Sequence, residues 1–338
     1  MTRAVVFAYH QIGVRCLRTL LARGVDVALV VTHDDAPGET IWFDSVRAAA
    51  EERGIEVVAP EDPNTDEVLS RVRGARPDFL FSFYYRRLLD ERLLAVAPRG
   101  AWNMHGSLLP KYRGRVPLNW AILHGETETG ATLHAMTPKA DAGAIVDQQA
   151  VPILPDDDAR EVYTKICVAA EIVLWRSLPA LLDGSAVLRE QDPAAATRFG
   201  ARRAEDGRID PALSARALHD LVRAVSKPFP GAFVDLPQGR LFVWRTIRVD
   251  GGVDGARAPA AGGARAAATG GARAAAPAEM RVVAGELSLF GADGNRLRVL
   301  DAQLGATPLD AARFRTVFGE RLVLPPLPPD PDKQGNLK

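Results

Sequence analysis

The sequence predicts an α/β protein: a Rossmann-like parallel sheet with helices on both faces, followed by a smaller OB-like β-barrel domain. Over the first 130 residues, short apolar runs of strand length alternate with helical patterns. Such alternation implies crossover connections between parallel strands. In the C-terminal part, short strands flank turns that contain glycine, which is typical of a small β barrel.

Length and composition fit two globular domains. Of 338 residues, 47% are hydrophobic and 25% are charged, which excludes a collagen-like or wholly disordered chain. The 42 basic and 42 acidic residues balance, so no net field attracts nucleic acid or an anionic membrane. Apolar runs are too short for a signal peptide or a membrane span, and Cys16 and Cys167 are isolated from other metal ligands. We therefore expect a cytoplasmic protein without a metal.

The elements of the first domain follow one another in βα order. Apolar runs predict strands at 4–8, 27–32, 55–59 and 79–83, and helical periodicity predicts helices at 12–23, 45–53, 65–72 and 89–97, the last of them followed by the segment 100–104. Two further strands, 131–136 and 144–151, are joined by the loop 137–143, and a helix at 159–182 closes the domain. The turn after the first strand lacks the glycine pattern of a dinucleotide site, and the chain contains no P-loop motif.

Four regions are expected along the chain. The catalytic domain covers 1–189, a linker 190–208, the β domain 209–322 and a Pro-rich tail 323–338. The β domain is expected to hold a hairpin of strands 232–236 and 240–249 and a second one of strands 280–289 and 296–304. A Gly-Ala-Arg-Ala repeat between the hairpins cannot bury a core, so we expect 251–278 to be a flexible inserted loop.

Polar residues concentrate in the apolar surroundings of 102–115. Asn103 and His105 stand two apart at the end of a predicted strand, so their side chains point the same way, at the edge where parallel sheets bind ligands. An amide that stabilises an oxyanion and an imidazole that moves a proton suffice for acyl transfer. Asp141, in a loop of the same domain, could orient the imidazole. The residues alone leave a second interpretation open, in which Asn103 caps a turn and His105 is a structural histidine.

The run Asn-x-His-Gly-Ser-Leu-Leu-Pro-Lys-Tyr-Arg-Gly occupies 103–114, and Asp141 follows 27 residues later. This pattern resembles the signature of the 10-formyltetrahydrofolate-dependent formyltransferase family. Within that family the chain most resembles the subgroup that formylates UDP-4-amino-4-deoxy-L-arabinose in lipid A modification and polymyxin resistance. That likeness extends from residue 4 to about residue 249 and rests on motifs at 7–10, 32–33, 81–86, 125–130 and 228–233.

The resemblance implies an enzyme that transfers a formyl group from 10-formyltetrahydrofolate to the amine of a nucleotide-linked amino sugar, without a metal. UDP-4-amino-4-deoxy-L-arabinose is the acceptor that it implies. Asn103, His105 and Asp141 match the family's catalytic trio. The positions that match the family's folate site are Arg87, Leu88, Leu89, Arg115, Thr137, Pro138, Lys139 and Ala140.

Four residues are candidates for binding the acceptor. His10 and Tyr84 follow predicted strands and so border the ligand crevice, although aromatic packing would place them there equally well. Lys111 and Arg113 could offset a diphosphate charge, although solvated loop residues would look the same. His134 alternates with apolar neighbours, and we expect it to line the core or the crevice.

Other activities use the same fold and donor. A methionyl-tRNA formyltransferase needs a basic surface, but residues 201–338 carry 20 basic against 15 acidic residues, and three of those arginines lie in the repeat. A formyl-folate hydrolase and a non-catalytic folate- or sugar-nucleotide-binding module are further alternatives. Members of the subgroup that the chain resembles are bifunctional and also carry a decarboxylase half. We expect that step to need another polypeptide here, so a separate UDP-glucuronic acid decarboxylase is a candidate partner. Neither nucleic acid nor a membrane is expected as a partner.

Overall fold

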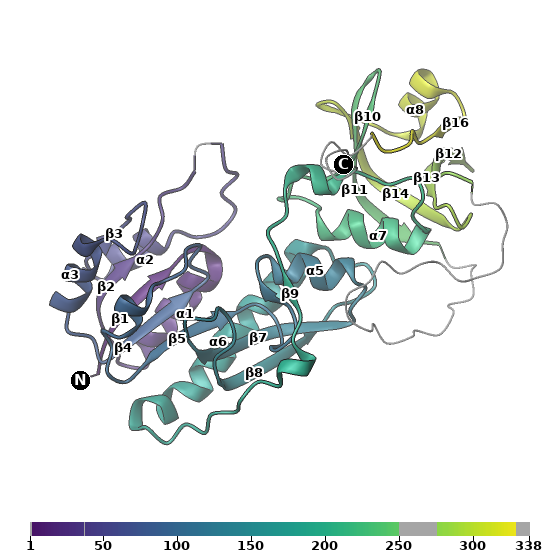
Figure 1. Cartoon of the computed structure of the whole chain (residues 1–338). Coiled ribbons are helices and arrows are strands. Elements are labelled where there is room, and N and C mark those ends of the chain that lie inside the picture. The colour runs from purple at the N-terminus through teal and green to yellow at the C-terminus, as the bar shows by residue number, and fades with distance from the viewer. Residues whose placement is uncertain (1, 37, 250–275, 329–338) are drawn as a thin grey trace, which may run out of the picture. The chain divides into compact units, whose positions relative to one another are not determined.

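The computed structural model describes residues 2–36, 38–249 and 276–328 (Figure 1). The chain divides into two compact units. Unit 1 comprises Met1–Ala121, Thr127–Ile153 and Glu161–Ala201, and unit 2 comprises Ile122–Glu126, Leu154–Arg160 and Arg202–Lys338. Most of the insertion expected at 251–278 and most of the tail expected at 323–338 lie outside the described residues.

A seven-stranded sheet forms the centre of unit 1, in the order β3-β2-β1-β4-β5-β7-β8. Its strands are β1 (Arg3–Ala8), β2 (Asp26–Val31), β3 (Val57–Val58), β4 (Phe79–Phe83), β5 (Ala101–His105), β7 (Glu128–Ala135) and β8 (Ile145–Pro152). The first five are parallel, whereas β7 pairs antiparallel with β5, and β8 antiparallel with β7. The carboxyl ends of β1, β4 and β5 therefore meet at one edge.

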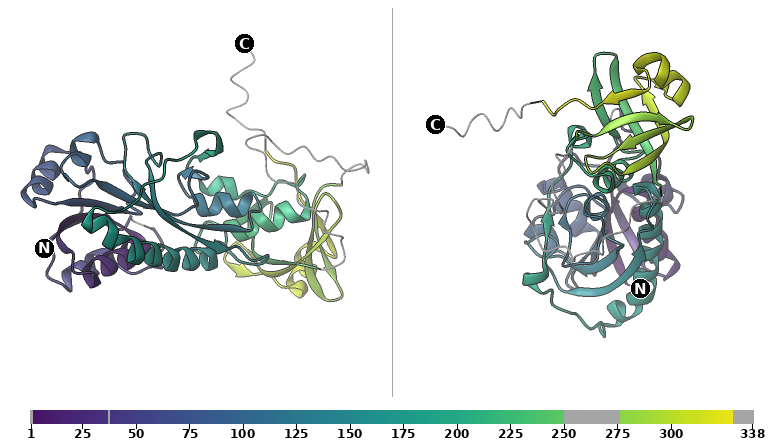
Figure 2. Two further views of the ribbon diagram at one scale, coloured as in Figure 1. Left: turned by 90° about the horizontal axis from the view of Figure 1, so that it is seen from below. Right: turned by 90° about the vertical axis from the view of Figure 1, so that its right-hand side faces the viewer.

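Helices cover both faces of this sheet, as predicted (Figure 2). They are α1 (His10–Ala22), α2 (Val46–Glu51), α3 (Asp66–Gly74), α4 (Glu91–Leu94), α5 (Pro117–Leu123) and α6 (Ala159–Asp183). Val5 and Phe7 of β1 pack with apolar residues of α3 and α4 on one face, and α1 and α6 lie on the other. The helix expected at 89–97 is shorter than predicted because Asp90 caps α4 at its start and the chain leaves the helix after Leu94.

A short pair of strands brings a distant segment back to unit 1. β6 (Arg113–Gly114) pairs in parallel with β9 (Arg198–Phe199). Gly114 has φ +99°, and a Cβ there would lie 2.2 Å from the carbonyl oxygen of Phe199, so the close approach requires glycine. Residues of the stretch expected as a linker thus lie against the segment that follows His105.

Unit 2 is a curled antiparallel sheet in the order β10-β11-β14-β13-β12-β16, and β15 also pairs with β14. The elements are α7 (Ala215–Ala224), β10 (Ala232–Leu236), β11 (Gly239–Arg248), β12 (Glu279–Val283), β13 (Glu286–Phe290), β14 (Arg296–Leu304), β15 (Thr307–Pro308), α8 (Ala311–Phe318) and β16 (Arg321–Val323). The single strand predicted at 280–289 is wrong: a turn at Ala284 and Gly285, both with positive φ, splits it into β12 and β13. The predicted fold class, an α/β domain followed by a smaller β domain, is confirmed.

Candidate active site

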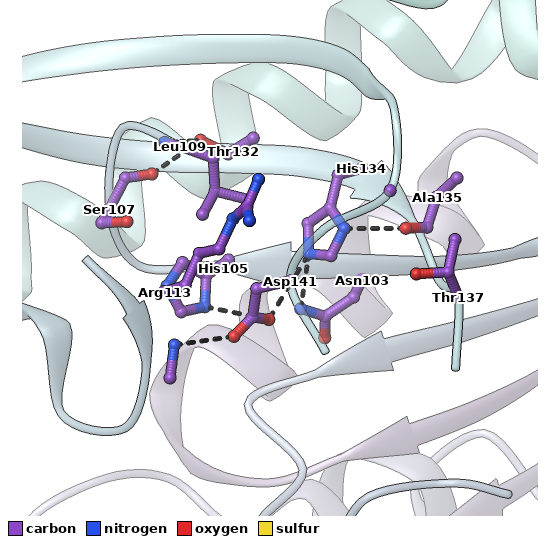
Figure 3. Close-up of polar contacts among 12 residues, drawn as sticks. Asn103, His105, Ser107, Leu109, Arg113, Thr132, His134, Ala135, Thr137 and Asp141 are labelled. Carbon is purple, nitrogen blue, oxygen red and sulfur yellow. Dashed lines mark hydrogen bonds and ion pairs between the residues drawn. The ribbon is translucent and has the colours of Figure 1, made fainter. Parts of the chain in front are cut away.

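Asn103 and His105 lie at the end of β5, and Asp141 reaches them from the loop between β7 and β8 (Figure 3). His105 Nδ1 is 3.6 Å from Asp141 Oδ1. His105 Nε2 donates a hydrogen bond of 2.8 Å to the carbonyl oxygen of Tyr112. Acceptor oxygens therefore face both nitrogens of a ring that is only 7% exposed, an arrangement that can stabilise positive charge on the imidazole.

Hydrogen bonds within the loop after β5, and between that loop and β7, hold the backbone of Tyr112 next to His105. Ser107 Oγ donates to the carbonyl oxygen of Lys111 (2.7 Å), and Thr132 Oγ1 of β7 donates to the carbonyl oxygen of Ser107 (2.6 Å). The same Thr132 oxygen accepts from the backbone N–H of Leu109 (3.2 Å). Ser107 and Thr132 are fully buried, so these bonds fix the backbone that orients the imidazole.

Asn103 is held by a histidine of the neighbouring strand. β5 and β7 pair in the register Asn103 opposite His134, and Asn103 Nδ2 lies 3.0 Å from His134 Nε2. His134 Nδ1 lies 2.8 Å from the carbonyl oxygen of Ala135, which can only accept, so Nδ1 carries the proton and Nε2 accepts from the Asn103 amide. Burial, and then the nearby His105, hold the pKa of His134 below its usual range. The ring is therefore neutral and suited to this role.

His134 contacts Asn103 in addition to lining the core. The ring is 1% exposed, and its alternation with apolar neighbours was read correctly as burial. Its partner Asn103 could be identified only from the register of β5 against β7.

The Asp141 carboxylate is held by a hydrogen bond to Oδ2, the oxygen that is not the one nearest His105. Its Oδ2 accepts a 2.8 Å hydrogen bond from the backbone N–H of Gly114, and its Oδ1 lies 3.8 Å from His134 Nε2. Asp141 has φ +59°, a left-handed conformation that costs energy for a residue other than glycine. The structure thus brings Asn103, His105 and Asp141 together.

The residues expected to bind folate lie in three segments of unit 1. Arg87 and Leu88 follow β4 and are exposed, Leu88 to 73%, whereas Leu89 is buried in the core. Arg115, next to β6, is exposed as well. Thr137, Pro138 and Lys139 are exposed, and Ala140 half-buried, in the loop that leads to Asp141.

The four residues expected to bind the acceptor differ in their surroundings. Lys111 is exposed, but Arg113 is 8% exposed, so Arg113 is not a solvated loop residue. Its guanidinium Nε and Nη2 donate to Gln191 Oε1 at 3.1 and 2.7 Å. Gln191 gave no signal in the sequence, because it stands in a polar stretch expected to be a linker.

His10 lies inside an aromatic cluster formed by His10, Trp42, Phe43, Tyr84 and Tyr163. Its ring stacks on Phe43 with centroids 3.7 Å apart and meets Trp42 edge-on at 4.9 Å. His10 Nδ1 hydrogen-bonds to the Tyr163 hydroxyl. Burial, helped by Arg86, lowers the pKa of His10 to about 3, so the ring is neutral near pH 7.

Tyr84 connects this cluster to the end of β5. A Cβ at Gly106, the residue after His105, would lie 1.8 Å from the Tyr84 hydroxyl, so the tyrosine packs directly over the glycine. The ring centroids of Tyr84 and His10 are 6.4 Å apart. Both residues therefore border the strand edge that carries His105.

Within the described ranges, no group of three or more His, Cys, Asp or Glu side chains is placed to hold a metal ion. Among the helices that the structure describes, none combines the length and apolarity needed to cross a membrane.

Solved structures with a similar fold include WlaRD, a sugar 3N-formyl transferase in the presence of dTDP and 5-N-formyl-THF. It is 19% identical, the match covers 91% of this chain and 98% of that chain, and the TM-score is 0.65. An N-formyltransferase from Helicobacter canadensis, in complex with folinic acid and dTDP-3-aminofucose, is 18% identical, with coverages of 91% and 100% and a TM-score of 0.64. A methionyl-tRNA formyltransferase from Clostridium thermocellum is 16% identical, with coverages of 75% and 95% and a TM-score of 0.52. These likenesses show a shared fold.

Two family models match the chain. Residues 5–178 match the model described as "Formyl transferase", and residues 202–316 match "Formyl transferase, C-terminal domain". The matched residues make up more than half of the sequence, and the chain is therefore a formyltransferase, a member of the formyl transferase family.

Proposed function

We propose that the protein transfers the formyl group of 10-formyltetrahydrofolate to the amine of a nucleotide-linked amino sugar. The observation that carries this proposal is the convergence of an amide, an imidazole and a carboxylate at the end of β5, with His105 Nδ1 3.6 Å from Asp141 Oδ1. Family membership supports formyl transfer. Two structures with the same fold hold a formylated folate together with dTDP or a dTDP-linked amino sugar, which supports the choice of donor and acceptor class.

The site residues fit the charges that this reaction creates. The sugar amine attacks the formyl carbon, so negative charge grows on the formyl oxygen and positive charge on the attacking nitrogen. The Asn103 amide, oriented by His134, donates a hydrogen bond to that oxygen, a kind of contact that contributes about 10²- to 10³-fold to the rate. His105 takes the proton from the amine nitrogen at Nδ1, which lies 3.6 Å from Asp141 Oδ1 and is not closed by a short hydrogen bond. It then gives this proton to the departing folate nitrogen, a transfer that contributes about 10²- to 10⁴-fold to the rate. The carbon–nitrogen bond to folate then breaks, which leaves tetrahydrofolate and a sugar formamide.

Asp141 stabilises His105 while the ring carries the extra proton. A carboxylate 3.6 Å from Nδ1, in a side chain only 14% exposed, acts through weaker solvent screening than it would at the surface. The hydrogen bond from Gly114 leaves Asp141 Oδ1 facing the ring.

Binding roles for the remaining residues belong to the same proposal. We assign folate binding to Arg87, Leu88, Leu89, Arg115 and the segment 137–140. The exposed residues of the segment 137–140 stand close to Asp141 in the sequence. The acceptor is assigned to His10, Tyr84, Lys111 and Arg113. The neutral aromatic cluster around His10 offers stacking surface, and the buried Arg113 guanidinium offers a permanent positive charge for a diphosphate.

The motifs that resemble the lipid A subgroup favour UDP-4-amino-4-deoxy-L-arabinose as the acceptor. On that assignment, a separate UDP-glucuronic acid decarboxylase supplies an earlier step and is a candidate partner.

An acceptor panel tests the proposal. Purified protein is incubated with 10-formyltetrahydrofolate and, in separate reactions, UDP-linked amino sugars, dTDP-linked amino sugars and charged initiator methionyl-tRNA, with the His105→Ala variant as a matched control. We expect a formamide product with an amino sugar nucleotide, fastest with UDP-4-amino-4-deoxy-L-arabinose, and none with the variant. Faster formylation of methionyl-tRNA than of every sugar nucleotide would overturn the acceptor class.

A further inference from the structure

Gln191 uses the full hydrogen-bonding capacity of its side chain inside unit 1. Its Nε2 donates to the backbone carbonyl oxygens of Asp141 (2.9 Å) and Gly143 (2.7 Å). Its Oε1 accepts from Arg113 Nε and Nη2 at 3.1 and 2.7 Å. A carboxamide has two N–H donors and two acceptor lone pairs, so all four are occupied. At 8% exposure, water cannot easily replace these bonds.

The backbone of the loop 137–143 is anchored to a distant segment by Gln191. Its own hydrogen bonds are short in sequence: Thr137 Oγ1 to the carbonyl oxygen of Lys139 (2.8 Å) and Ala142 N–H to the same oxygen (3.2 Å). Asp141 in this loop has φ +59°, so the backbone must be restrained to stay in that conformation. Gln191 supplies two hydrogen bonds from a segment about 50 residues away.

Gln191 also binds Arg113, which precedes Gly114, the residue that donates a hydrogen bond to the Asp141 carboxylate. Gly114 N–H donates to Asp141 Oδ2 at 2.8 Å, and the side chain of the preceding Arg113 is bound to Gln191. In the part of the chain that the structure describes, Gln191 is the only side chain that accepts a hydrogen bond from this guanidinium. One amide thus links both sides of the contact between Gly114 and Asp141.

We propose that Gln191 is a positioning residue, which sets the distance and angle between the Asp141 carboxylate and His105 Nδ1. This inference rests on the proposed role of His105 and Asp141 in formyl transfer. Gln191 stands between the two segments that match the family models, 5–178 and 202–316, and it touches neither substrate nor reacting atoms in this scheme. Its effect on the reaction passes through Asp141.

A double-mutant cycle with Gln191→Met and Asp141→Asn tests the proposal. Methionine has a similar length and no amide, so it removes all four hydrogen bonds. We expect Gln191→Met to lower kcat by about tenfold or more, because the charge that Asp141 stabilises develops in the transition state. In the Asp141→Asn background the same change should cost less than about twofold, since the group through which it acts is gone. Equal costs in the two backgrounds, or a loss confined to KM, would overturn the proposal.

Gln191→Glu separates the hydrogen bonds that Gln191 donates to the loop from those that it accepts from Arg113. Glutamate keeps acceptor oxygens for Arg113 but cannot donate to the carbonyl oxygens of Asp141 and Gly143. We expect it to lose kcat as Gln191→Met does, and wild-type kcat in this variant would contradict the proposal. Gln149→Met is the matched control, because Gln149 lies on β8 and accepts a 3.0 Å hydrogen bond from Arg176, away from the trio; it should keep wild-type kcat.

A readout independent of turnover distinguishes this inference from the proposed function. In protein labelled with nitrogen-15 at histidine, the His105 ring resonances should shift in Gln191→Met in the same direction as in Asp141→Asn. Unmoved resonances would overturn the positioning role even in an active enzyme. Shifted resonances in a protein that formylates no acceptor would support the positioning role and reject the proposed function.

Discussion

Replacement of His134 tests whether the Asn103 amide must be held in place to work. His134→Leu fills a similar buried volume and removes the acceptor that lies 3.0 Å from Asn103 Nδ2. A hydrogen bond of this kind contributes about 0.5–1.5 kcal/mol net, so its loss should lower kcat by about 2- to 13-fold at about 1.4 kcal/mol per factor of ten. The largest decrease in kcat to expect is that caused by losing the oxyanion donor itself, about 10²- to 10³-fold.

His134→Gln restores an acceptor without an imidazole and should recover part of that loss. Because the pKa of His134 is held low, the ring is neutral near pH 7 and both variants should keep the wild-type pH–rate shape. The assay is single-turnover formyl transfer at saturating substrates, with thermal unfolding as the folding control. Wild-type turnover in a folded His134→Leu protein would refute the reasoning, as would equal losses in the two variants.

Truncation of the strand-end residues tests the chemistry: Asn103→Ala and His105→Ala should each lower kcat by about 10²-fold or more and leave folate affinity, measured by calorimetry, within several-fold. Full activity in His105→Ala would reject its role in proton transfer. Asp141→Asn should lower kcat with little change in the folate KM, and unchanged steady-state rates would make Asp141 a loop carboxylate only. Burial lowers the pKa of His10 from 6.5 to about 3. As the pH falls below 6.5, the unfolded chain therefore binds a proton at His10 that the folded chain does not bind. This difference lowers the free energy of unfolding by about 2 kcal/mol at about pH 5. Urea unfolding should show that loss reduced in His10→Phe, and an equal loss in both proteins would contradict it.

Local sequence signals predict the strands that form the site-bearing edge of the sheet. The apolar runs of β1, β4 and β5 are buried strands with polar residues at or just after their ends. Because Asn103 and His105 are two residues apart in a strand, strand geometry alone predicts that their side chains point the same way. The sequence does not predict the turn inside 280–289, because the only turn-forming residue there is the single Gly285, between two short strands of similar composition.

The contacts that hold the trio in place depend on tertiary structure. His134 meets Asn103 through the antiparallel register of β7 against β5, and Gln191 reaches Asp141 from a polar stretch with no periodicity. The sequence leaves open whether Arg113 is a solvated loop residue, and the pairing of β6 with β9 accompanies its burial. Periodicity reports which face of an element is buried, but it does not report which distant segment covers that face.

The fate of the formyl carbon tests the central claim most directly. Protein is mixed with 10-formyltetrahydrofolate labelled in the formyl carbon and with UDP-4-amino-4-deoxy-L-arabinose, and the products are separated and counted within one turnover. The account predicts that the label appears in the formamide of the sugar nucleotide at the rate at which tetrahydrofolate forms, and that Asn103→Ala slows both together. Release of the label as formate at that rate, with none in the sugar, would show that water is the acceptor and would contradict the account.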